Sequence, residues 1–147
     1  MEHGALSPQN LKDSCFIVGR AFGVRNLGRL LYEITLVESN AGQVKSRFGG
    51  VCSISHHLFG LMKKHHGFYE YRKDVLKAFS IDLKNIQFVQ LSTNPNLSLI
   101  VAAAWVMSNL DSVPKKRVAR ARLYQKWWRD LPVGEFMRIT EERCDSL

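Results

Sequence analysis

The spacing of hydrophobic and polar residues along the first third of the chain predicts a β-hairpin. Residues 15–18 form a short apolar run that is typical of a strand. Between residues 30 and 37 two sets of side chains alternate with the period of a strand, and residues 39–42 have the composition of a turn. An extended pattern resumes over residues 44–48, so we expect residues 30–48 to form a hairpin.

The middle of the chain changes to helical spacing. Ser53 is a candidate N-cap for a helix over residues 54–66, which would end at Gly67. A second helix is predicted over residues 69–80. In both segments the apolar residues recur at intervals of three and four, which predicts one buried face per helix.

The last part of the chain predicts a second hairpin and a basic helix. Residues 86–91 and 97–103 are expected to be strands joined by a turn at 93–96. A helix should begin at 111–114 and continue to about Arg129, followed by one short strand over 136–140. We therefore predict an α+β fold: an antiparallel sheet from two β-hairpins, packed with two central helices and a basic C-terminal helix.

A chain of 147 residues fits a single domain, here residues 1–147, with 1–7 expected to be flexible and 135–147 a peripheral tail. No run of apolar residues reaches the length that spans a bilayer. Cys15, Cys52 and Cys144 are far apart and form no CxxC pair, which favours reduced thiols and an intracellular protein of the cytoplasm or nucleus.

Charge narrows the class of partner. Lys and Arg number 21 against 13 Asp and Glu, a formal charge of +8. Such an excess produces a field that attracts nucleic acid, an anionic membrane surface or an acidic protein.

The basic residues are densest in residues 114–130, PKKRVARARLYQKWWRD. At about 100° per residue, one narrow face of the predicted helix carries Lys115, Arg122, Lys126 and Arg129. Arrayed cations neutralise phosphates, and an exposed tryptophan stacks on a base or sits at a membrane interface. The candidate nucleic-acid or anion-binding residues are Lys115, Lys116, Arg117, Arg122, Lys126, Trp127, Trp128 and Arg129, and the footprint could be widened by Lys45, Arg47, Lys63 and Lys64.

The sequence carries no recognisable catalytic site. It lacks the GxxxxGK[ST], GxGxxG, HExxH and GxSxG motifs. Four histidines lie between residues 56 and 66, but no pair has the HxxxH spacing that would place two ligands on one helix face. We therefore predict no enzyme activity, no catalytic residue, no metal and no cofactor.

Two functions fit these features. The first is a nucleic-acid-binding accessory or regulatory protein, for RNA or DNA, in which the basic helix contacts phosphate. The alternative is a self-associating structural protein of the viral matrix type, a homo-oligomer bound to an anionic membrane by a polybasic helix and interfacial tryptophan. An adaptor for an acidic protein partner is a third interpretation.

Overall fold

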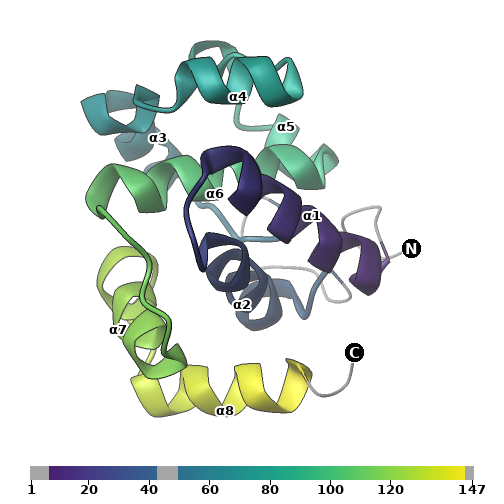
Figure 1. Ribbon diagram of the computed structural model, residues 1–147, viewed down its shortest axis with the longest axis vertical. Coiled ribbons are helices and arrows are strands. Elements are labelled where there is room, and N and C mark those ends of the chain that lie inside the picture. Colours follow the sequence, from purple (N-terminus) through teal and green to yellow (C-terminus); the bar gives the residue numbers. More distant parts are fainter. Residues whose placement is uncertain (1–6, 43–49, 145–147) are drawn as a thin grey trace.

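The computed structural model describes residues 7–42 and 50–144, and every regular element in these two ranges is a helix (Figure 1). The α-helices are α1 (Pro8–Phe22), α2 (Leu27–Ser39), α3 (His56–Lys64), α4 (Arg72–Phe79), α5 (Gln90–Thr93), α6 (Pro95–Asn109), α7 (Arg117–Trp127) and α8 (Val133–Cys144). Two short 3-10 helices, η1 (His66–Tyr69) and η2 (Leu83–Asn85), connect them.

The middle of the fold is α6, which packs against α1, α2, α5 and η1. Asn94 caps this helix by accepting the Leu97 N–H at 3.1 Å, and Pro95 occupies its first turn. Every residue from Leu97 to Met107 is buried. Figure 1 shows α3 and α4 on one side of α6, with α2, α7 and α8 on the other.

The first two helices approach each other closely. A Cβ atom placed on Gly19 of α1 would lie 2.6 Å from the backbone nitrogen of Gly28 in α2. Ser7 caps α1 by accepting the Asn10 N–H, with Pro8 in the first turn. The helix ends at Gly23, whose φ of 69° suits a residue without a Cβ.

The predicted α+β class is wrong, because the described residues contain no strand and no sheet. Residues 30–37, predicted as a strand, belong to α2. This helix is buried on almost every side, so it has no solvated polar face and shows no helical period. In the sequence Glu33 and Thr35 resemble the solvated positions of a strand, but both are buried in this helix.

The other predicted strands are also helical or irregular. Residues 15–18 lie in α1, 97–103 lie in α6 and 136–140 lie in α8. A short apolar run such as 97–103 has the same composition in a buried strand and in a buried helix, and 15–18 and 136–140 are too short for their period to distinguish the two. Residues 86–89 are a connection, and residues 90 and 91 are the first two residues of α5. The predicted strand over 44–48 lies outside the described residues.

The helices predicted in the middle of the chain are present with shifted ends. The first is α3, capped by Ser55, which accepts the Leu58 N–H at 3.0 Å, and not by Ser53. The second divides into η1 and α4, and Ser80 ends α4 with a left-handed φ of 58°. The basic helix is α7, which starts later than predicted.

The segment that follows α7 packs on the fold as α8, against α2 and α7. Phe136 is fully buried and contacts Tyr124 of α7 with ring centroids 5.0 Å apart. Arg143 donates to the carbonyls of Leu36 and Val37, which lie at the C-terminal end of α2. Across the part of the chain that is described, no helix combines the length and apolar character needed to cross a membrane.

The three thiols should differ in reactivity. Burial raises the pKa of Cys52 to about 12 and that of Cys15 well above its usual value, so neither forms thiolate at mildly alkaline pH. Cys144 is only half-buried. Brief alkylation of the folded protein, followed by peptide mass spectrometry, should label Cys144 and spare the other two until denaturant is added. Rapid labelling of Cys15 or Cys52 would contradict this packing.

Candidate anion-binding surface

Two glutamates of α2 are buried, Glu33 and Glu38. Arginines that lie in α7 or just after it neutralise them. Glu33 accepts hydrogen bonds from Arg117 at 2.8 Å and from Arg120 at 2.6 and 2.8 Å. The Arg120 side chain is 2% exposed and also donates to the carbonyls of Pro114 and Lys115. Burial opposes ionisation of Arg117, but its hydrogen bond to Glu33 leaves the pKa raised. Arg117 and Arg120 therefore form ion pairs with Glu33 that hold α7 against α2.

The predicted basic face is not continuous along α7. The helix ends at Trp127, and Arg129 lies beyond it, where it donates to Glu38 at 3.1 Å. The Glu38 side chain is 1% exposed, so Arg129 also has a structural role. Within residues 114–130, the predicted cations that are exposed and have no acidic partner among the described residues are Lys115, Lys116, Arg122 and Lys126.

The two tryptophans are half-buried and have partners within the fold. The indole N–H of Trp128 donates to the Cys52 carbonyl at 3.0 Å. The Trp127 carbonyl accepts the indole N–H of Trp105 at 3.2 Å, and the ammonium of Lys126 lies 5.0 Å from the Trp127 ring centroid. Both rings also line a small apolar pocket between α2, α6 and α7. These contacts hold the rings against the fold.

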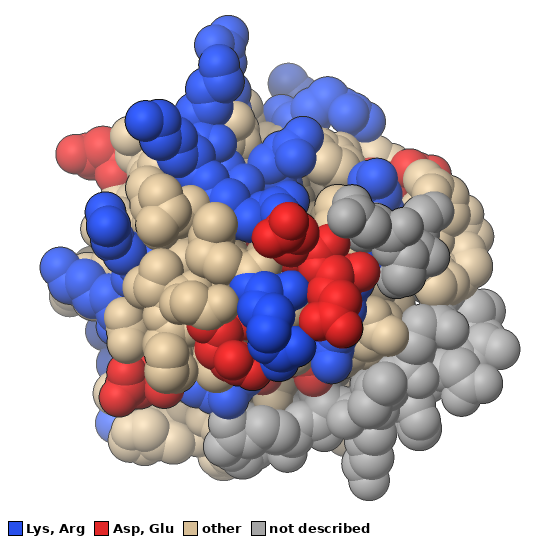
Figure 2. All heavy atoms as spheres, turned by 90° about the horizontal axis from the view of Figure 1, so that it is seen from below, with Lys and Arg blue, Asp and Glu red and all other residues tan. Residues whose placement is uncertain are grey.

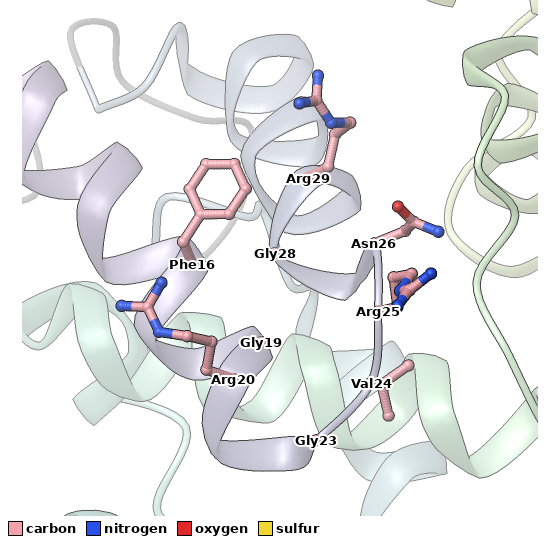
Figure 3. A pocket seen from close by; sticks show the side chains of 9 residues that line it. All are labelled: Phe16, Gly19, Arg20, Gly23, Val24, Arg25, Asn26, Gly28 and Arg29. Atoms are coloured by element: carbon pink, nitrogen blue, oxygen red, sulfur yellow. The ribbon is translucent and has the colours of Figure 1, made fainter.

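A larger pocket opens where α1 turns into α2 (Figure 3). Its volume is about 600 Å³, and none of its lining residues is acidic. Arginines line it from three places: Arg20 from the last turn of α1, Arg25 from the turn, and Arg29 from the first turn of α2. The lining residues are Phe16, Gly19, Arg20, Gly23, Val24, Arg25, Asn26, Gly28 and Arg29, and we call this site the α1–α2 pocket.

The charge of the α1–α2 pocket is not compensated inside the fold. Its three arginines are exposed, and none has a carboxylate partner among the residues the structure describes. The N-cap residue of α2, Asn26, makes no side-chain cap, so the positive end of that helix adds to the field. Three guanidinium groups around one pocket are suited to binding phosphate oxygens, which they can contact in bidentate geometry.

One hydrogen bond joins this pocket to the start of the basic segment. The side-chain amide of Asn26 donates to the Val113 carbonyl at 3.2 Å. The exposed residues Lys115 and Lys116 follow immediately and precede α7, and we call them the lysine pair. Figure 2, seen from the side of α7 and α8, shows Lys and Arg side chains projecting from one edge, whereas acidic and basic side chains intermix nearer the middle.

The pocket arginines were not among the candidate residues predicted from the sequence. A signal for them exists: from residue 14 to residue 32 the chain contains no acid and three arginines.

The residues predicted to widen the footprint differ in exposure and in hydrogen bonding. Lys63 donates to three carbonyls, those of Leu83, Lys84 and Ile86, whereas Lys64 is exposed. Lys45 and Arg47 lie outside the described residues.

The histidines and carboxylates of the described ranges form no group of three or more that could hold a metal ion. Comparison of the chain with protein-family models, with curated proteins and with solved structures gives no match.

Proposed function

We propose that the chain is a non-enzymatic nucleic-acid-binding protein whose phosphate contacts come from the α1–α2 pocket and the lysine pair. The observation that carries the proposal is a pocket with three arginines and no acid, beside two further exposed lysines. Cations of this kind bind a polyanion because each neutralised phosphate releases condensed counterions. Arg122 and Lys126, on the exposed side of α7, extend the surface.

The alternative of a membrane-bound matrix protein has less support. A polybasic helix held at a lipid interface needs tryptophans whose indole groups face the headgroups. Here the indole N–H of Trp128 is bound to the Cys52 carbonyl, and both Trp127 and Trp128 are half-buried.

The cysteines bear on where the protein works. All three are free, which favours the reducing environment of the cytoplasm or nucleus as its location.

The first test replaces Arg20, Arg25 and Arg29 together by glutamine. We expect affinity for short labelled RNA or DNA, measured by fluorescence anisotropy, to fall at least about tenfold. The slope of log affinity against log salt should become shallower by about 2 for a single strand, because three phosphate contacts are lost. The three side chains are exposed, so the variant should fold normally.

The matched control replaces Lys73, Lys77 and Lys84 by glutamine. These lysines are exposed on α4 and η2 and do not line the α1–α2 pocket, so this variant loses the same charge elsewhere. It should retain most of the affinity. Equal losses in the two variants would show that net charge alone drives binding, and capture by anionic liposomes without nucleic-acid binding would favour the matrix-type function.

Arg117 and Arg129 should be left unchanged in such tests. Each is paired with a buried glutamate, so its removal perturbs the fold as well as the surface. A second set, Lys115→Gln with Lys116→Gln, tests the lysine pair without that complication.

A further inference from the structure

We infer that the α1–α2 pocket selects single-stranded nucleic acid, by placing a base against the Phe16 ring while a neighbouring phosphate is held by the arginines. This inference rests on the proposed function and specifies which form of the polyanion the pocket accepts. It comes from the one aromatic side chain among the pocket residues, Phe16, which is only half-buried.

The Phe16 ring is held in place at the pocket wall. A Cβ atom on Gly28 would lie 2.8 Å from Cδ1 of Phe16, so the ring packs directly over that glycine. Phe16 and Arg20 are four residues apart on α1 and therefore share a helix face. In the view of Figure 3 the ring lies between the guanidinium groups of Arg20 and Arg29. The aromatic ring and the two arginines thus line the same pocket.

This combination fits a nucleotide better than an isolated anion. Inorganic phosphate would use the guanidinium groups and leave the ring without a partner, whereas a nucleotide offers a base as well as a phosphate. The pocket is open to solvent, and its volume of about 600 Å³ is comparable to the about 300–1,000 Å³ of sites for small organic ligands. Proteins that bind single strands combine a cationic track with aromatic rings on which bases stack.

The geometry also discriminates against a duplex. The bases of a duplex are stacked and paired inside the helix, and extruding one costs a few kcal/mol. The face of the Phe16 ring can stack only on a base that is not already stacked in a duplex, so an unpaired base reaches it without that cost. A duplex can still contact the exposed guanidinium groups through its backbone, which predicts weaker binding and not its complete loss.

The experiment compares three labelled probes of equal length: oligothymidylate, an abasic oligomer with the same sugar-phosphate backbone, and a duplex. The full chain is titrated with each at the same salt concentration. We expect oligothymidylate to bind at least about fivefold more tightly than the abasic oligomer, the size of one base–aromatic contact. The duplex should also bind less tightly than oligothymidylate.

The diagnostic variant is Phe16→Leu, which keeps an apolar side chain over Gly28 but removes the aromatic face. It should lose the preference for oligothymidylate over the abasic oligomer while binding the abasic oligomer as the unaltered protein does. The matched control is Phe88→Leu, which changes another half-buried phenylalanine, outside the pocket, next to Phe59 and His56. This control should retain the preference.

The outcomes separate this inference from the proposed function. Equal binding of oligothymidylate and the abasic oligomer, together with sensitivity to the triple arginine change, would overturn the inference and leave the nucleic-acid proposal standing. A preference for bases that persists in Phe16→Leu would also overturn it. Failure of the unaltered protein to bind any probe at low salt would overturn both.

Discussion

Replacing Arg120 by alanine is expected to destabilise the protein by about 3–5 kcal/mol, because it leaves a buried carboxylate without its main partner. Glu33 and Arg120 are each 2% exposed, and two hydrogen bonds join them. Arg117 also reaches Glu33 but is 26% exposed, so it cannot replace the shielding that Arg120 gives. Urea unfolding followed by circular dichroism would measure the loss.

Two further variants identify the cause of that loss. Adding Glu33→Gln to Arg120→Ala should restore part of the stability, since the buried charge is then removed. Arg138→Ala, which breaks exposed pairs with Glu135 and Glu142, should change stability little. If Arg120→Ala unfolds no more easily than Arg138→Ala, the buried pair does not anchor α7.

Replacing Gly19 by valine should be nearly as costly, at about 3 kcal/mol, the upper end of the usual range for overpacking. The added Cβ would lie 2.6 Å from the nitrogen and 2.9 Å from Cα of Gly28. These are backbone atoms, so α1 and α2 must separate. Their separation should also change the shape of the α1–α2 pocket. Thermal unfolding together with oligothymidylate titration would detect both effects.

Gly60→Val is the control for this change. Gly60 is exposed in α3, and a Cβ there would meet nothing within 4 Å. The free energy of unfolding of this variant should therefore differ from that of the unaltered protein by less than about 0.5 kcal/mol. If Gly19→Val is as well tolerated as Gly60→Val, the close approach of α1 and α2 is not as the structure shows it.

The sequence indicated the two helices in the middle of the chain, each of which has one buried and one solvated face. The segments that became α3 and α4 show this period, and α7 was recognised from its helix-forming residues. The prediction failed for α2 and α6, which are buried almost all round, and it also failed for α1 and α8, although each of these has one buried face. In α2 the polar residue Glu33 is internal because Arg117 and Arg120 neutralise it, and they come from more than eighty residues later.

The site was only partly predictable for the same reason. The basic segment was visible, but its sequence could not show that Arg117 and Arg129 turn inward while Lys115 and Lys116 stay exposed. The α1–α2 pocket forms only where two helices meet, so its arginines do not make up a motif that the sequence shows. Gly19 and Gly28 both lie inside helices, at positions where a side chain would prevent close packing.

The pairing of Glu33 with Arg120 has a consequence for folding during synthesis. The two residues are 87 positions apart, so α2 leaves the ribosome long before α7 exists. Until then the Glu33 carboxylate must stay hydrated, and α2 cannot settle in its final buried position. We therefore expect nascent chains that end before Arg120 to remain sensitive to protease in α2, and protection to appear as soon as α7 has emerged.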